Sequence, residues 1–193
     1  EVPLLLDTSG STRSDLAVIQ RAAEHFINSL RPGDRVSIIA FKSYVEDNRS
    51  VAASEVLCDL TDDRAKLKTV LSQVKTSNGT PYYDGLLQVA EQVFRHKPAS
   101  EFRGRRALVA LTDGVDSTSI GGFDEVEEKF AEAGFISYFI QVNTREFFEE
   151  NLLGDCQYAM RFSAAQIRRY YRTFYRNSKI EKTFDFCKLG DFE

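Results

Sequence analysis

Five oxygen-bearing side chains, in three separate turns, are the residues of this sequence best suited to hold a metal ion. Asp7, Ser9 and Ser11 occupy every second position after a short apolar run, so in extended backbone all three point the same way. Thr80 lies in a later loop, and Asp113 follows another apolar run. Two carboxylates and three hydroxyls, without His or Cys, are hard ligands that suit Mg²⁺, Mn²⁺ or Ca²⁺ rather than zinc.

These residues need a scaffold that brings the three turns together, and the hydrophobic pattern predicts one. Buried strands are expected at 2–6, 36–41, 107–111 and 135–142, an edge strand or hairpin at 43–60, and helices at 16–30, 61–74, 81–94 and 124–133. Strands that alternate with helices predict an α/β fold: a doubly wound, mostly parallel, Rossmann-like sheet with helices on both faces and one antiparallel edge strand. In such sheets ligands bind at the carboxyl ends of the strands, where the turns after Leu6 and Leu111 lie.

Length and composition indicate a globular core and exclude several classes of protein. The chain has 193 residues, 42% of them apolar, and no apolar run approaches the roughly 18 residues of a membrane helix. Its 25 Lys and Arg against 29 Asp and Glu give a net charge of −4, which argues against bulk attraction to nucleic acid or anionic lipid. We therefore expect no nucleic-acid partner and no membrane insertion within this segment. Three Cys and two His are too few for a disulfide scaffold or for zinc chemistry.

The domain organisation follows from the same pattern. We expect the α/β domain to span residues 1–165 and a C-terminal helix and tail over residues 166–193 to pack on it. Within the last part, 145–153 and 164–175 are expected to be helical, and 158–162 and 182–186 extended. The chain begins with Glu1 rather than Met, so we expect a segment of a longer chain.

The five oxygen-bearing residues resemble the metal-ion-dependent adhesion site of von Willebrand factor A domains. That site has the pattern Asp-x-Ser-x-Ser, a distant Thr and a distant Asp, and Asp7, Ser9, Ser11, Thr80 and Asp113 match it without a departure. The Gly-Thr-Pro and Leu-Thr-Asp-Gly contexts match as well, and the resemblance covers roughly residues 2–165. The chain looks most similar to bacterial A-domain proteins abundant in acidobacteria, which share its Leu-Leu-Leu-Asp-Thr-Ser-Gly-Ser opening.

This resemblance implies a binding domain for cell adhesion or assembly, not an enzyme. In such domains Ser9, Ser11 and Thr80 would coordinate one divalent cation directly, while Asp7 and Asp113 would often act through water. A weakly neutralised hard cation attracts carboxylates, so an Asp or Glu of a partner protein would complete the site. The resemblance implies Mg²⁺ first, with Mn²⁺ or Ca²⁺ as alternatives, and an extracellular or periplasmic location.

Three alternative interpretations remain open at this point. A metal-dependent hydrolase or phosphotransferase could use the same site, although the sequence lacks a Gly-x-x-x-x-Gly-Lys-Ser/Thr loop, a Gly-x-Ser-x-Gly elbow and an Asp-x-Asp nucleophile motif after the first strand. A scaffold domain could hold a purely structural metal. In the simplest interpretation, the hydroxyls only cap helices and the two acids are solvated at strand ends.

Other candidate residues carry weaker signals. His25 and His96 lie on predicted helices with no second ligand nearby in sequence, which favours surface roles. Asp116 could orient the loop that follows the second acid of the predicted site, or could be solvated there. Tyr82 and Tyr83 could contact a partner, although packing against the sheet is the commoner use of such residues.

The C-terminal part adds a basic cluster and two cysteines. Residues 168–182 contain six Arg and Lys residues, which could form a nucleic-acid patch but are better interpreted as the solvated side of an amphipathic helix. Cys156 and Cys187 could form a disulfide, whose loop of about 30 residues would stabilise the fold by roughly 3–4 kcal/mol. Cys58 is expected to be a buried free thiol.

Overall fold

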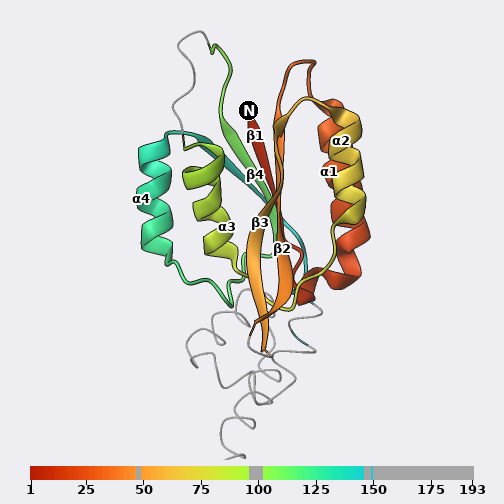
Figure 1. The fold of residues 1–193 in the computed structure, drawn as a ribbon, viewed down its shortest axis with the longest axis vertical. Helices are drawn as coiled ribbons and strands as arrows, with labels where there is room; N and C mark the ends of the chain where they lie inside the picture. Colours follow the sequence, from red (N-terminus) through yellow and green to blue (C-terminus); the bar gives the residue numbers. More distant parts are fainter. Residues whose placement is uncertain (47–48, 96–101, 146–148, 150–193) are drawn as a thin grey trace, which may run out of the picture. The chain divides into compact units, whose positions relative to one another are not determined.

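The computed structural model describes residues 1–46, 49–95, 102–145 and 149 (Figure 1). Its sheet has the strand order β3-β2-β1-β4-β5, formed by β1 (Val2–Leu6), β2 (Val36–Glu46), β3 (Arg49–Thr61), β4 (Ala107–Thr112) and β5 (Ile136–Gln141). All neighbouring strands are parallel except β3, which runs antiparallel to β2 at the edge. The predicted doubly wound, mostly parallel sheet with one antiparallel edge strand is therefore confirmed.

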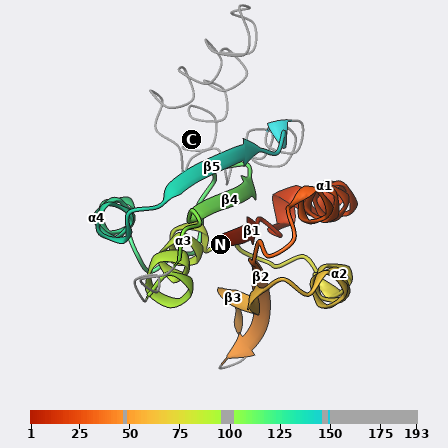
Figure 2. The ribbon, with the colours of Figure 1, turned by 90° about the horizontal axis from the view of Figure 1, so that it is seen from above.

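Helices cover both faces of this sheet (Figure 2). Helices α1 (Leu16–Ser29) and α2 (Arg64–Gln73) pack on one face, and α3 (Tyr82–Gln88) and α4 (Phe123–Ala133) pack on the other. In β1, Leu4 and Leu6 belong to the first core and Leu5 to the second, which explains why this strand is apolar at successive positions. No helix in the described part of the chain is long and apolar enough to cross a membrane.

The helix ends follow local rules, with one departure from the predicted pattern. The Asp63 carboxylate caps α2 by accepting a hydrogen bond from the Lys66 N–H at 3.0 Å, and Gly134 ends α4 with a φ of 63°. The helix predicted over 81–94 is α-helical only to Gln88 and then continues as a π-helical turn, in which the Phe94 N–H bonds the Val89 carbonyl at 2.9 Å. This wider turn keeps both Val89 and Phe94 in the core.

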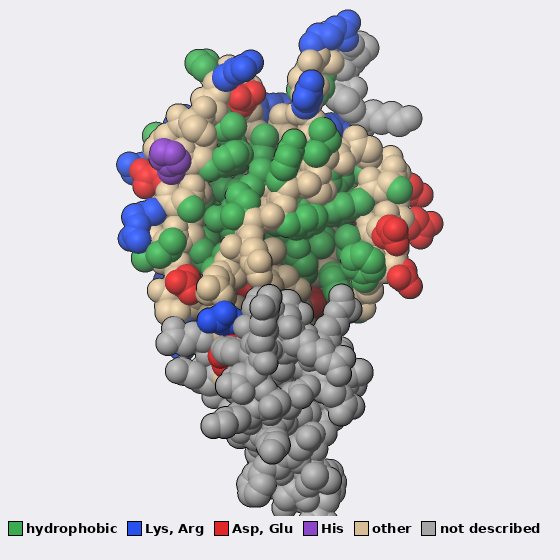
Figure 3. Space-filling view, turned by 180° about the vertical axis from the view of Figure 1, so that it is seen from behind, with side chains coloured by type: hydrophobic (Ala, Val, Ile, Leu, Met, Phe, Trp, Pro, Cys, Tyr) green, Lys and Arg blue, Asp and Glu red, His purple; other side chains and the backbone are tan. Residues whose placement is uncertain are grey.

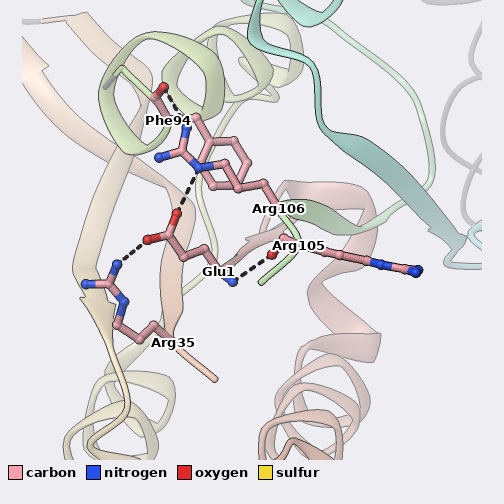
Figure 4. A network of polar contacts seen from close by, with 5 residues as sticks. All are labelled: Glu1, Arg35, Phe94, Arg105 and Arg106. Atoms are coloured by element: carbon pink, nitrogen blue, oxygen red, sulfur yellow. Dashed lines mark hydrogen bonds and ion pairs between the residues drawn. The ribbon is translucent and has the colours of Figure 1, made fainter. Parts of the chain in front are cut away.

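A buried ion-pair network joins three strands at their amino ends (Figure 4). The Glu1 carboxylate, whose side chain is 6% exposed, pairs with Arg35 before β2 and with the Nε of Arg106 before β4 at 2.9 Å. The Arg106 guanidinium also lies 4.9 Å from the centre of the Phe94 ring. This end of the sheet thus contains a buried carboxylate that is neutralised by two arginines.

The outer strand β5 exposes an apolar surface (Figure 3). Ile136, Tyr138, Phe139 and Ile140 are each between 48% and 55% exposed. Residues Glu1–Val142 form one compact unit, and the second unit begins at Asn143, of which only residues 143–145 and 149 are described. The predicted boundary at residue 165 and the elements expected beyond 149 lie outside the described residues.

Candidate metal centre

The first turn of the predicted site begins where β1 ends. The main-chain N–H of Asp7 still bonds the Leu111 carbonyl of β4 at 2.8 Å, so the chain is extended when it reaches this residue. The next side chain, Thr8, points to the other side, where its hydroxyl donates to the Phe41 carbonyl and accepts from the Phe41 N–H at 2.9 and 3.0 Å. Asp7 and Ser9 thus alternate with Thr8, as the spacing predicts. The predicted alternation does not continue to Ser11, because the chain enters a 3-10 helix at Gly10–Asp15.

Four of the five predicted residues are joined by hydrogen bonds. The Asp7 Oδ1 accepts from the Ser9 N–H at 3.1 Å, and the Ser9 and Ser11 hydroxyls lie 3.0 Å apart. The Ser11 hydroxyl donates to the Asp113 Oδ2 at 2.7 Å. Asp113 follows β4, the neighbour of β1, and so the residues that follow two adjacent parallel strands meet at one edge of the sheet.

Thr80 is fixed at the same edge through its main chain. It is buried, its carbonyl accepts from the Ser117 N–H at 3.0 Å, and its N–H donates to the Ser117 hydroxyl at 3.1 Å. Three residues earlier, the Ser77 N–H donates to the Thr8 carbonyl at 2.6 Å. The loop that carries Thr80 is thus tied both to the turn after β1 and to the loop that follows Asp113.

Thr112 and Thr12 support the site, and neither residue is predicted from the sequence pattern. The Thr112 hydroxyl donates to the Asp7 Oδ2 at 2.8 Å, and the Thr12 hydroxyl donates to the Asp7 carbonyl at 2.9 Å. Both side chains are buried. The sequence does show that Thr12 follows Ser11 and that Thr112 precedes Asp113. Sequence spacing alone, however, does not show which main-chain or carboxylate oxygen each hydroxyl reaches.

Asp116 binds the first turn of α3. Of its two possible roles, orienting the loop after Asp113 or lying free in solvent, the structure supports the first. Its Oδ1 accepts hydrogen bonds from the Tyr82 and Tyr83 N–H groups at 2.9 and 3.2 Å and from the Ser119 hydroxyl. A carboxylate at this position satisfies N–H groups that have no partner within the helix. Asp116 is therefore half-buried and attaches the loop after β4 to α3, rather than lying free in solvent.

The two tyrosines differ in their surroundings. Tyr82 is 7% exposed and packs in the core beside the sheet, as the commoner interpretation expects. Burial, together with the negative charges of Asp7 and Asp113, raises the pKa of its phenol, so the hydroxyl stays neutral. Tyr83 is half-buried, and its ring meets that of Phe123 edge-on with a centroid separation of 6.1 Å.

The electrostatics at this edge favour a cation. Burial raises the pKa of the Asp7 carboxyl and the nearby charge of Asp113 raises it further, while hydrogen bonds from Ser9 and Thr112 oppose the shift. Among the described residues no Lys or Arg forms an ion pair with Asp7. The described part of the chain also contains no group of three or more His, Cys, Asp or Glu side chains suited to a metal. The hydroxyls and two carboxylates fit a hard divalent cation and do not fit zinc.

The remaining candidates lie away from this edge or outside the described residues. Cys58 is buried with a free thiol, as expected. His25 is exposed on α1, consistent with a surface role. His96, the pair Cys156 and Cys187, and the basic cluster at 168–182 lie outside the described residues.

Comparison with known proteins identifies the family of this fold. The family model of the von Willebrand factor type A domain matches residues 2–115, which include all five predicted site residues. Among curated proteins, none matches the chain.

Solved structures show the same fold at low sequence identity. BatB from Bacteroides thetaiotaomicron superposes with a TM-score of 0.54 and 21% identity over 72% of this chain and 65% of that one. An aerotolerance-related membrane protein from Bacteroides fragilis superposes with a TM-score of 0.50 and 21% identity over 73% of this chain and 66% of that one. Proximal thread matrix protein 1 from the mussel byssus superposes with a TM-score of 0.57 and 15% identity over 72% of this chain and 37% of that one. The chain thus spans less than two thirds of the length of each of these proteins.

Proposed function

The chain belongs to the von Willebrand factor type A domain family, and we propose that it is a protein-binding domain for adhesion or assembly, in which a bound divalent cation accepts a carboxylate from a partner protein. The observation that supports this proposal is the hydrogen-bonded network of Asp7, Ser9, Ser11 and Asp113 at the carboxyl ends of β1 and β4. Ligands of doubly wound sheets bind at this edge.

The side chains divide into two roles in this proposal. The hydroxyls of Ser9, Ser11 and Thr80 would hold the ion directly, and the carboxylates of Asp7 and Asp113 would balance its charge through water. A divalent cation held there supplies an electrophilic position for the carboxylate of the partner. We expect Mg²⁺, with Mn²⁺ or Ca²⁺ as alternatives, because all three ions prefer such oxygen ligands.

Enzymatic turnover is the competing proposal, and the hydrogen bonds of the two serines give it little support. The Ser9 and Ser11 hydroxyls bond each other, and the Ser11 hydroxyl donates to Asp113, so the partners of these hydroxyls are a hydroxyl and a carboxylate. A serine nucleophile needs a positioned base whose pKa lies near the working pH. A phosphatase and ATPase screen at saturating Mg²⁺ tests this alternative directly, and turnover that disappears in Ser9→Ala would establish an enzyme.

We further propose that the domain works in an extracellular or periplasmic setting. This follows from its resemblance to exported bacterial A-domain proteins, and a protein of similar fold from Bacteroides fragilis is described as a membrane protein. The test is to express the full open reading frame in its own host and to locate the protein by fractionation.

Calorimetry tests the metal site itself. We expect Mg²⁺, Mn²⁺ or Ca²⁺ to bind the chain with a stoichiometry of one and Asp7→Ala to abolish binding. The matched control is Asp62→Ala, which removes an exposed carboxylate before α2 and should leave the affinity unchanged. The proposal fails if none of the three ions binds, or if Asp7→Ala binds them as tightly as the wild type. Partner binding that persists in EDTA would instead favour a scaffold with a structural metal.

A further inference from the structure

The Thr112 hydroxyl bridges the two acidic turns of the candidate metal centre. It donates to the Asp7 Oδ2 at 2.8 Å and accepts from the Gly114 N–H at 2.9 Å. An ionised carboxylate can only accept a hydrogen bond and an N–H can only donate one, so a group that joins the two must do both. A hydroxyl has this capacity, whereas a valine side chain of the same shape does not.

The register between β1 and β4 places Thr112 beside Asp7. Leu6 of β1 pairs with Leu111 of β4, and both side chains belong to the first core. Side chains alternate along a strand, so the residue that follows each leucine points to the opposite face of the sheet. The Asp7 N–H also bonds the Leu111 carbonyl, which holds the two chains together at this point. The pairing of the two strands therefore brings the hydroxyl to the carboxylate.

The second hydrogen bond of Thr112 shapes the turn that carries Asp113. Gly114 has a φ of 79°, a left-handed conformation that glycine adopts without strain, and its N–H turns back to the Thr112 hydroxyl. In the same turn the Asp113 Oδ1 accepts from the Val115 N–H at 3.1 Å. Asp113 thus lies inside a turn that Thr112 closes. One hydroxyl orients the carboxylate of Asp7 and the main chain on both sides of Asp113.

Burial makes this hydroxyl hard to replace. Asp7 is fully buried and Thr112 is 4% exposed, so water has little access to the Asp7 Oδ2 once the hydroxyl is removed. Gly114 is exposed, and its freed N–H can bond water instead. Loss of the hydroxyl should therefore separate the Asp7 carboxylate from the turn after β4 without a large change in packing.

Thr112 differs from the neighbouring hydrogen-bond donors in what it connects. The Ser9 N–H, which donates to the Asp7 Oδ1, lies only two residues further along the same turn. Ser11 joins the two turns by donating to Asp113, but the proposed function assigns its hydroxyl to the ion. Thr112 joins the two turns and is not itself a proposed ligand, so its effect on metal affinity can be tested without removal of a ligand.

From these contacts we infer that Thr112 is a positioning residue of the metal centre. It sets the affinity for the ion by holding the Asp7 carboxylate and the Asp113 turn in the arrangement that the ion requires. This inference rests on the proposed function, because it requires the ion to bind at this edge of the sheet. Groups that hydrogen-bond the side chains of metal sites contribute roughly ten- to hundredfold to metal affinity. Because Asp7 is proposed to act through water, we expect the lower end of this range for Thr112.

Calorimetric titration of Mg²⁺ into matched variants of the 193-residue chain tests the inference. Thr112→Val removes the hydroxyl and keeps the shape of the side chain, and we expect it to weaken Mg²⁺ binding about tenfold. Thr112→Ala removes the same hydroxyl and should give the same loss, so the result does not depend on one substitution. Thr112→Ser retains a hydroxyl and should keep most of the wild-type affinity.

Ser37→Ala is the matched control for the loss of a buried hydroxyl. The Ser37 hydroxyl donates to the Cys58 carbonyl at 2.8 Å, and Ser37 pairs with Pro3 near the amino end of β1, away from the candidate site. In urea unfolding in EDTA, both Ser37→Ala and Thr112→Val should unfold at a lower urea concentration than the wild type, because each leaves a buried acceptor without its donor. Only Thr112→Val should also lose affinity for Mg²⁺, a result that a merely structural role does not produce.

The possible outcomes distinguish the inference from the function on which it rests. If Mg²⁺ binds the wild type, and Thr112→Val and Thr112→Ala bind it as tightly, the inference is overturned and the proposed function stands. An equal loss in Thr112→Ser would also overturn it, because the packing of the side chain and not its hydroxyl would then matter to the ion. If Mg²⁺, Mn²⁺ and Ca²⁺ all fail to bind the wild type, the proposed metal site and the inference both fail.

Discussion

Replacing Asp7 by Asn is expected to stabilise the metal-free protein and to abolish its stabilisation by Mg²⁺. Asp7 is fully buried, Asp113 opposes its charge, and its hydrogen-bond donors, Ser9 and Thr112, are neutral. An Asn side chain fits the same partners, because its Oδ1 can accept from the Ser9 N–H and its Nδ2 can donate to the Thr112 hydroxyl, which accepts as well as donates. The substitution therefore removes a buried charge and keeps its hydrogen bonds.

The magnitude follows from the balance of desolvation and hydrogen bonding. A buried carboxylate costs several kcal/mol in lost hydration, and the two hydrogen bonds that Asp7 accepts recover about 1.5–3 kcal/mol each. We expect Asp7→Asn to raise the free energy of unfolding by about 1–2 kcal/mol without metal. Mg²⁺ at a hundred times its Kd should add about 2.7 kcal/mol to the wild type and nothing to the variant. The order of the two stabilities should therefore reverse when Mg²⁺ is added.

Urea unfolding of the wild type and of Asp7→Asn, each in EDTA and in Mg²⁺, measures the four free energies of unfolding that this prediction compares. Asp62→Asn makes the same change in net charge at an exposed position and should shift the free energy of unfolding by less than about 0.5 kcal/mol in either condition. If Asp7→Asn is less stable than the wild type in EDTA, the buried charge is not a cost to the fold and the reasoning is wrong. If Mg²⁺ stabilises both proteins equally, the ion binds elsewhere.

Three further predictions test other parts of the structure. Glu1→Gln should lower the free energy of unfolding by about 3 kcal/mol in urea titrations, because it leaves a partly buried Arg106 without its charge partner, whereas Glu55→Gln, which breaks an exposed pair, should cost less than about 1 kcal/mol. Asp116→Ala should cost about 2 kcal/mol and should increase amide hydrogen exchange over residues 114–122, since it removes the acceptor that attaches this loop to α3; unchanged exchange there would contradict the role assigned to it. Burial raises the pKa of the Cys58 thiol, so mass spectrometry should show slow alkylation of Cys58 in the native protein and fast alkylation in urea. The free energy of unfolding that Cys58 contributes should also fall as the pH rises above about 8.5, because the thiol of the unfolded chain ionises first.

The fold could be predicted from the sequence because its dominant signals are local. Three successive leucines bounded by a turn predict a strand covered on both faces, and the sheet confirms this for β1. The side chains of Asp7, Ser9 and Ser11 meet as predicted, but the extended backbone assumed for all three is wrong at Ser11, because Gly10–Asp15 forms a 3-10 helix. Period-two and period-3.6 patterns carry this information within a few residues.

The contacts that complete the site could not be predicted, because they join residues far apart in the sequence. Thr112 reaches Asp7 across 105 positions, and Asp116 reaches Tyr82 across 34. Which hydroxyl faces which carboxylate depends on the register between β1 and β4, and no local pattern encodes that register. The π-helical turn after α3 was missed because the other apolar positions of this segment fit an ordinary helix. Val89 and Phe94, five residues apart, lie on different sides of an α-helix and share a buried side only in the wider turn.

The two ends of β1 differ in how the chain balances a buried carboxylate, and this difference supports the proposed exchangeable cation at Asp7. At the amino end the chain buries the carboxylate of Glu1 and neutralises it with Arg35 and Arg106. At the carboxyl end it buries Asp7 beside the second acid, Asp113, and supplies neutral donors instead. An arginine beside Asp7 would neutralise its carboxylate permanently and would occupy this edge of the sheet. Neutral donors instead leave the charge of Asp7 available to the proposed cation. The contrast between the two ends of β1 supports the proposed binding role of Asp7, because the chain neutralises the buried carboxylate of Glu1 with its own side chains.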